Sequence, residues 1–96
     1  MKTVFVPLAG REYEDAFEYY EAEEPGQGER FRRAVWATIG IIEEHPQIGR
    51  EVRPGVRKIL VQRFPYKLLY SIQGDTLRII AVAHGHRKPD YWADRA

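Results

Sequence analysis

The feature that most constrains the fold is a change in the spacing of apolar residues halfway along the chain. In residues 9–44 they recur every three or four positions, which is the period of an amphipathic helix. In residues 56–83 they tend to alternate with polar residues, which is the period of a strand. A chain that changes period once favours helices packed on a sheet, so we expect an α+β fold.

Two helices are predicted in the first half, over residues 9–23 and 29–44. Each carries one apolar stripe, formed by Tyr13, Ala16, Phe17 and Tyr20 in the first and by Phe31, Ala34, Val35, Thr38, Ile39 and Ile42 in the second. The Pro-Gly break between them is short, which predicts an antiparallel helix pair. A short strand over residues 3–6, ended by Pro7, precedes them.

Three strands are predicted in the second half, over residues 56–63, 66–73 and 76–83. The last two are joined by Gly74-Asp75, a two-residue loop with glycine first, which favours a hairpin turn. The expected order is therefore β-α-α-β-β-β, with an antiparallel sheet covered on one side by a two-helix hairpin.

Alternation along these strands predicts which side chains face the helices. Those expected to face inward are Tyr66, Leu68, Tyr70 and Ile72 in one strand and Leu77, Ile79 and Ala81 in the next. Lys67 and Arg78 then lie on the outer face. The strand over residues 56–63 fits two orientations: either Lys58 joins these cations, which we favour, or the pair Arg57 and Arg63 does.

The charge distribution indicates a basic second half. Residues 1–48 carry 5 Lys/Arg and 10 Asp/Glu, a net charge of −5. Residues 49–96 carry 10 Lys/Arg and 4 Asp/Glu, a net charge of +6, so the whole chain has a net charge of +1. If the halves occupy different faces, the basic side suits phosphates or an acidic partner.

With 96 residues, no cysteine and no apolar run long enough for a signal peptide or membrane span, we expect one domain, 1–96, in the cytoplasm.

A recurrent pattern of basic, aromatic and histidine residues runs through the second half. It comprises Arg57, the run Arg-Phe-Pro-Tyr at 63–66, Tyr70, the run 84–92 and Arg95. With the expected element order, the tyrosine-rich first helix and the stop at Pro46, this pattern resembles the ParE/RelE superfamily of toxins, in particular its plasmid-stabilisation branch. The resemblance spans nearly the whole chain.

The resemblance implies the growth-arresting toxin of a type II toxin–antitoxin system, neutralised by a cognate antitoxin. Some members resemble ribosome-dependent mRNA endoribonucleases, whereas others inhibit DNA gyrase by protein contact without cutting RNA. The chain lacks the lysine cluster that the best-known nucleases carry in the second helix and the segment after it. A degenerate module that only binds antitoxin is a third possibility.

The endoribonuclease hypothesis assigns roles to residues near the end of the last strand. RNA cleavage needs a base, an acid and cations at the phosphate, without a metal or cofactor. The predicted catalytic residues are His84, His86, Arg87 and Tyr91. The predicted substrate-binding residues are Lys58, Arg63, Lys67 and Arg78.

Purely structural roles compete with these assignments. His84 and His86 are equally well explained as polar residues at a strand end, and no third ligand at suitable spacing completes a metal site. The segment 87–92 is also typical of a strap that packs Tyr91 and Trp92 onto the core. Phe64-Pro65-Tyr66 is better explained as a turn and core anchor than as a base-stacking platform.

Two aromatic residues are candidates for binding a protein partner. Trp36 projects about 60° beyond the apolar stripe of the second helix, at about 100° per residue, and Tyr19 projects likewise from the first. Exposed tryptophan is a frequent interface anchor, so the antitoxin, gyrase or a second copy of the chain are candidate partners. The alternative is that the C-terminal strap covers Trp36.

Overall fold

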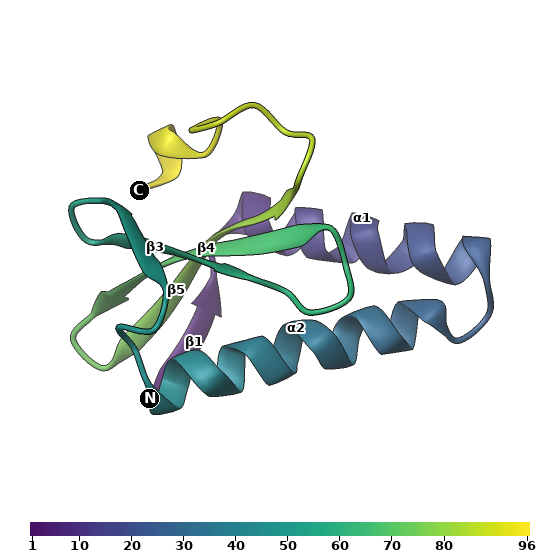
Figure 1. Cartoon of the computed structure of the whole chain (residues 1–96), viewed down its shortest axis with the longest axis horizontal. Coiled ribbons are helices and arrows are strands. Elements are labelled where there is room, and N and C mark those ends of the chain that lie inside the picture. Colours follow the sequence, from purple (N-terminus) through teal and green to yellow (C-terminus); the bar gives the residue numbers. More distant parts are fainter.

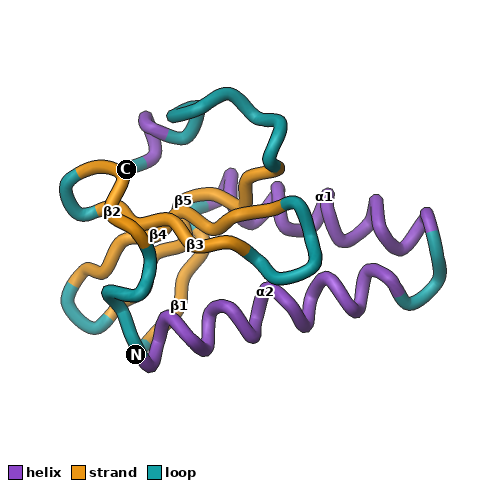
Figure 2. The backbone as a smooth tube through the Cα atoms, in the orientation of Figure 1, coloured by secondary structure: helices purple, strands orange, loops and turns teal.

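The computed structural model describes all 96 residues and contains two long helices and five strands (Figure 1). In chain order the elements are β1 (Lys2–Phe5), α1 (Pro7–Glu23), α2 (Gln27–Glu44), β2 (Arg50–Arg53), β3 (Val56–Leu60), β4 (Tyr66–Gln73), β5 (Thr76–His84) and a short 3-10 helix, η1 (Ala93–Arg95). The helix pair lies on one side of the sheet, and the C-terminal tail lies on the other (Figure 2). The expected α+β fold is thus confirmed.

The five strands form one mixed sheet in the order β1-β5-β4-β3-β2. β1 runs parallel to β5, and every other neighbouring pair is antiparallel. β2 was not predicted from the sequence, because this four-residue edge strand, Arg-Glu-Val-Arg, has three charged residues and no apolar alternation. Charged, short edge strands of this kind resist pairing with other chains.

The helix hairpin is fixed at its turn by one carboxylate. Glu21 accepts hydrogen bonds from the backbone N–H groups of Gly26 and Gly28, each at 3.0 Å, and so satisfies donors at the first turn of α2. A Cβ at Gly28 would lie 2.8 Å from the carbonyl oxygen of Phe17, so only glycine allows α1 and α2 to approach this closely. Proline at the first turn of α1 starts that helix.

The main core lies between the helices and the inner face of the sheet. Phe31 is fully buried and packs against the rings of Tyr20, Phe64 and Tyr66, with centroids 5.2–5.4 Å away. Tyr70 is also fully buried, and its hydroxyl donates to the carbonyl of Pro46 and accepts from the N–H of Gly49, both at 2.9 Å. These bonds attach the loop after α2 to the core.

A β-bulge changes the predicted facing of β5. Leu69 is opposite Ala81, but Tyr70 is opposite Ile79, so Ile80 is an extra residue in β5. The prediction that Ala81 faces the helices is therefore wrong: Ala81 packs on the outer face, and Val82 takes the inward position. A single-residue shift reverses every side chain after it. Ile72, also expected inward, is 37% exposed.

The orientation of β3 agrees with the favoured alternative. Ile59 and Val61 join the helix-side core, and Lys58 lies on the outer face, opposite Leu69. β3 ends at Leu60, three residues earlier than predicted, because Arg63 adopts a left-handed φ of 70° and Pro65 follows. Phe64 packs on Tyr20 and Phe31 within the core, as expected of a turn anchor.

Candidate functional site

The C-terminal tail, residues 85–96, crosses the outer face of the sheet (Figure 1). Trp92 is only 3% exposed and belongs to a second, smaller apolar cluster with Leu69, Ile80 and other outer-face residues. The guanidinium of Arg53 in β2 lies 5.6 Å from its ring centroid. The tail therefore acts as the strap that the alternative interpretation described.

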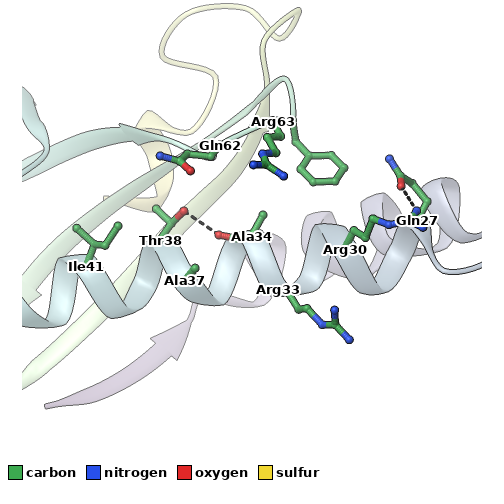
Figure 3. Close-up of a pocket in the computed structure, with 10 residues that line it drawn as sticks. Gln27, Arg30, Arg33, Ala34, Ala37, Thr38, Ile41, Gln62 and Arg63 are labelled. Carbon is green, nitrogen blue, oxygen red and sulfur yellow. Dashed lines mark hydrogen bonds between the residues drawn. The ribbon is translucent and has the colours of Figure 1, made fainter.

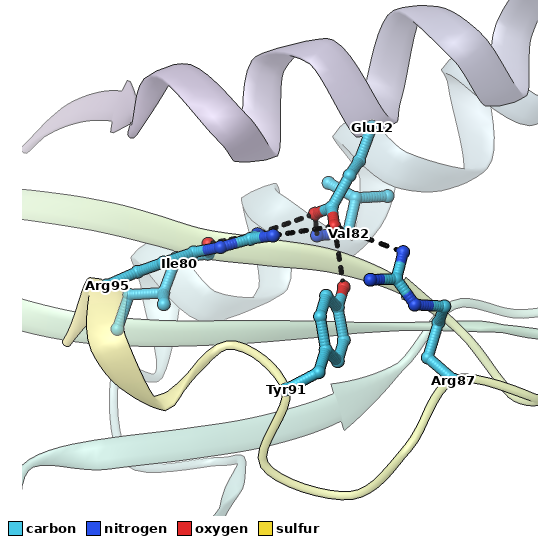
Figure 4. A network of polar contacts seen from close by, with 6 residues as sticks. All are labelled: Glu12, Ile80, Val82, Arg87, Tyr91 and Arg95. Carbon is cyan, nitrogen blue, oxygen red and sulfur yellow. Dashed lines mark hydrogen bonds and ion pairs between the residues drawn. The ribbon is translucent and has the colours of Figure 1, made fainter.

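The tail is attached to α1 through a single carboxylate, that of Glu12 (Figure 4). The Tyr91 hydroxyl donates to Glu12 Oε2 at 2.8 Å, and the Arg95 guanidinium donates to both Glu12 oxygens at 2.9 and 3.0 Å. Arg87 lies 3.8 Å from the same carboxylate, at ion-pair distance. Three tail residues thus converge on one side chain, which is only 16% exposed.

Glu12 also caps the free edge of β5. β1 pairs with β5 only as far as Ile79. On that edge of the sheet, the residues of β5 after Ile79 therefore have no neighbouring strand. Glu12 Oε1 accepts the backbone N–H of Val82 at 3.0 Å, and Arg95 donates to the carbonyl of Ile80 at 3.2 Å. These contacts satisfy edge groups that would otherwise be unpaired.

Glu12 was not predicted as a site residue, because it is one of several acidic residues on the polar side of α1. Nothing in its local sequence distinguishes it from Glu14 or Asp15, both of which are exposed. Its role depends on the short length of β1 and on the path of the tail, and neither can be derived from the period of α1.

Burial and the bond to Glu12 raise the pKa of the Tyr91 phenol well above its usual value. The bond to Glu12 likewise raises the pKa of Arg95. Tyr91 therefore remains protonated at neutral pH and donates a hydrogen bond to a carboxylate, so it does not act as a general base in this state.

His84 and His86 lie together at the end of β5, near Arg87. Their rings stack with centroids 4.9 Å apart, and His84 Nδ1 accepts the backbone N–H of His86 at 3.0 Å. His84 and Arg87 line a hollow of about 290 Å³ with Tyr19 and Tyr66. The structure thus brings together two of the predicted catalytic residues, His84 and Arg87, at this hollow; His86 is exposed beside it.

Two of the predicted substrate-binding lysines lie together on the outer face. Lys58 and Lys67 line a second hollow of about 310 Å³, next to Gly85. Burial and the nearby charges of Arg50 and Lys67 lower the pKa of Lys58. Arg50 was not predicted to be part of this cluster because it lies in the missed strand β2, directly opposite Lys58.

The other two predicted cations lie elsewhere. Arg78 lies opposite Ser71, which is four residues after Lys67 in β4. Leu69, midway between Lys67 and Ser71, is buried and packs with Trp92 of the tail. Arg78 and Lys67 are thus separated on the outer face. Arg63 lines a groove beside α2 on the helix side of the molecule. The four predicted substrate-binding residues therefore do not form one surface.

No group of three histidine or carboxylate side chains is placed to hold a metal ion.

The two candidate partner-binding aromatics are both exposed. Trp36 is 42% exposed and contacts Phe5, with ring centroids 5.9 Å apart, and Tyr19 is 59% exposed. The alternative that the tail covers Trp36 is wrong, because the tail packs across the opposite side of the sheet.

None of the helices is long and apolar enough to cross a membrane.

Comparison with known proteins identifies the family. Residues 4–89 match the family model described as "ParE toxin of type II toxin-antitoxin system, parDE". The chain belongs to the ParE toxin family. A solved structure titled "Chromosomal ParDE TA system from P. aeruginosa" is similar to this ParE-family chain, with a TM-score of 0.63 and 19% identity over 88% of this chain and 95% of that one. No curated protein matches the sequence.

Membership of the ParE family makes this chain a toxin of a type II toxin–antitoxin system. Its partner in such a system is a cognate antitoxin. The solved structure supports the α+β fold alone, because its sequence identity to this chain is low.

Proposed function

We propose that this ParE-family toxin arrests growth by protein contact, as an inhibitor of DNA gyrase, and does not cut RNA. The observation that carries the proposal is the convergence of Arg87, Tyr91 and Arg95 on Glu12. The matching family model is that of the ParE toxin, and the superfamily that the sequence resembles includes members that inhibit DNA gyrase by protein contact.

Several of the polar groups that RNA cleavage would use are paired with Glu12 or lie apart from one another. Such a reaction needs a base, an acid and cations gathered at one phosphate. Tyr91 is bound to Glu12, and Arg87 lies within ion-pair distance of the same carboxylate. Trp92 packs on the outer sheet face next to Leu69, between the positions of Lys67 and Arg78.

Contact with a protein target needs an exposed anchor and no titrating residue. Trp36 meets this requirement, because nearly half of its side chain is exposed while its ring is supported by Phe5. Large aromatic side chains held rigidly at a surface contribute strongly to protein interfaces. We therefore assign Trp36, with Tyr19 as a second candidate, to binding of the target.

A ribosome-dependent endoribonuclease is the second candidate function. The observation that favours it is the stacked pair His84 and His86 beside Arg87, at a hollow open to solvent. Histidine exchanges protons near neutral pH, and an arginine fork suits a phosphate. This candidate requires His84 or His86, whereas gyrase inhibition does not.

The two functions are distinguished by assaying gyrase supercoiling and cleavage of ribosome-bound mRNA with the same purified protein. We expect inhibited supercoiling, intact mRNA, and about tenfold or greater loss of inhibition in Trp36→Ala, the size of a typical interface hot spot. His84→Ala should inhibit supercoiling as well as the wild type. mRNA cleavage that disappears in His84→Ala or His86→Ala, with supercoiling unaffected, would establish the endoribonuclease instead.

A further inference from the structure

Three basic side chains stand in a row on the outer face of the sheet. Lys58 in β3 lies directly opposite Arg50 in β2. On its other side Lys58 is opposite Leu69 of β4, so Lys67, two residues before Leu69, is its diagonal neighbour. Direct cross-strand neighbours have Cβ atoms about 5 Å apart, and diagonal ones about 7–8 Å. We call these three residues the lysine cluster; Arg63, in the loop after β3, is directed toward α2 instead (Figure 3).

The lysine cluster has no counter-charge within the chain. None of its three side chains takes part in an ion pair. The hollow of about 310 Å³ beside Lys58 and Lys67 has no acidic lining residue. Glu51, the acidic residue of β2, lies opposite Arg57 and lines a hollow with the inward-facing Tyr70, on the helix side of the sheet. The positive charge of the cluster is therefore available to a ligand.

This arrangement opposes folding. Like charges directly opposite each other on neighbouring strands destabilise a sheet, and Lys58 and Arg50 form such a pair. Burial and the charges of Arg50 and Lys67 hold the pKa of Lys58 below its ordinary value, so the three groups are close enough to repel one another. Residues that break a local rule of stability are expected at functional sites. Binding of an anion would remove the repulsion.

The surface around the cluster suits an extended anion better than a small one. Arg50 is exposed at the edge of the sheet, and Leu60, opposite Lys67, is 71% exposed. The cations thus follow one another across three adjacent strands at an open surface and do not converge on one point. Duplex DNA presents a matching line of charge, because it carries one negative charge per about 1.7 Å of its axis.

We propose that the lysine cluster binds the phosphate backbone of duplex DNA. The inference rests on the proposed function, since DNA gyrase acts on duplex DNA and a toxin that binds gyrase meets the enzyme together with this substrate. Lys58 and Lys67 contribute point charges, and Arg50 offers a guanidinium fork to a phosphate. Because the contacts are to phosphates alone, binding is independent of base sequence and weakens steeply with salt.

The rings beside the cluster are not free to stack on unpaired bases. Phe64 and Tyr66 line the hollow, but both pack against Phe31, with ring centroids 5.3 and 5.2 Å away. The other neighbour of Tyr66 is His84, at 5.1 Å. Proteins that bind single-stranded nucleic acids combine cations with exposed rings on which bases stack. Cations without such rings match a duplex, whose bases are already paired, more closely than single-stranded RNA.

The test is a titration of a fluorescein-labelled DNA duplex with the full chain, followed by anisotropy at several salt concentrations. Each phosphate that is neutralised contributes about −0.9 to the slope of log K against log salt, so three cations predict a slope of about −2.7. Lys58→Gln and Lys67→Gln should each make this slope shallower by about one unit and weaken binding to duplexes of different sequence equally.

A pair of variants at one exposed position separates charge from shape. Leu60→Glu places a carboxylate opposite Lys67 and should abolish duplex binding, whereas Leu60→Gln should bind like the wild type. Circular dichroism should show that both are folded, because the side chain that they replace is largely exposed. Arg11→Gln removes an exposed arginine of α1, outside the cluster, and should leave both the affinity and the salt slope unchanged.

The inference is overturned if the salt slope is unchanged in both lysine variants, or if Leu60→Glu binds the duplex as Leu60→Gln does. Tighter binding of a single-stranded uridine oligonucleotide through the same lysines would overturn it in favour of RNA. Supercoiling assays of the same proteins separate this inference from the proposed function. Inhibition of gyrase by a chain that does not bind the duplex would contradict the inference alone. Duplex binding that depends on Lys58, without inhibition of gyrase, would contradict the proposed function alone.

Discussion

The two faces of the sheet are covered in different ways. The inner face is covered by two long helices and a continuous apolar core that includes Phe31, Ile39 and Leu77. The outer face is covered by a tail held by one tryptophan and one carboxylate, Trp92 and Glu12. The inner face is thus stabilised by many interchangeable apolar contacts, whereas the outer face depends on a few specific ones, so the two faces should respond differently to substitution.

The largest effect is expected at the inner face. Phe31→Ala removes a fully buried ring that contacts both helices and the sheet, and should lower the free energy of unfolding by about 3–5 kcal/mol. Urea denaturation followed by circular dichroism measures this change. The control Tyr19→Ala removes an exposed ring and should change stability little. A loss below about 1 kcal/mol in Phe31→Ala would show that the helix hairpin is not the main source of stability.

A smaller and more local effect is expected at the outer face. Trp92→Ala removes the main apolar contact of the tail and should cost about 2–3 kcal/mol, expressed as opening of residues 85–96 rather than as global unfolding. Native-state hydrogen exchange should show lost protection in the tail and nearly unchanged protection in α2. Equal loss in both regions would mean that the two faces unfold as one unit.

Glu12→Gln keeps the shape of the side chain but removes its charge. Hydrogen bonds to charged groups contribute about 1.5–3 kcal/mol, so we expect the tail to loosen by about 2 kcal/mol. A double-mutant cycle with Arg95→Gln measures the pairing itself, since both side chains are largely buried. Glu14→Gln on the same helix is the matched control. A coupling energy near zero would show that the tail is held by Trp92 alone.

The smallest effect is expected in the lysine cluster of the outer face. Because the pKa of Lys58 is lowered in the folded chain, the unfolded chain binds the proton more tightly, and stability rises with pH between the lowered pKa and the ordinary value of 10.5. Lys58→Gln should remove this pH dependence and raise the melting temperature by about 1–3 °C at neutral pH. Thermal melts at several pH values measure both changes. A lower melting temperature in Lys58→Gln would mean that the like charges of Arg50 and Lys67 do not destabilise the cluster.

The sequence predicted the inner face well because that face is periodic. The stripes of α1 and α2, the alternation in β4 as far as Tyr70 and the hairpin at Gly74-Asp75 are local patterns, and the structure has all of them. The outer face was predicted less well because it depends on exceptions to periodicity. The bulge at Ile80, the charged strand β2 and the approach of Glu12 to the tail are each decided by partners far away in the chain.

The candidate site shows the same division. The exposure of Trp36 follows from its angle on the helix, so the sequence predicted it. The separation of Arg63 from Lys58 and Lys67 depends on a left-handed residue after a strand that ends early, which alternation does not predict. Engagement of Tyr91 by Glu12 changes the functional interpretation, and it is visible only in three dimensions.

We propose that this ParE-family toxin acts through an exposed protein-binding surface and not through its histidines. The deciding measurement is the growth of cells that express the toxin without its antitoxin, at matched protein levels of the wild type, the double variant His84→Ala/His86→Ala and Trp36→Ala. We predict that the double variant arrests growth as the wild type does and that Trp36→Ala relieves the arrest. Arrest that is lost in the double variant and retained in Trp36→Ala would contradict the account.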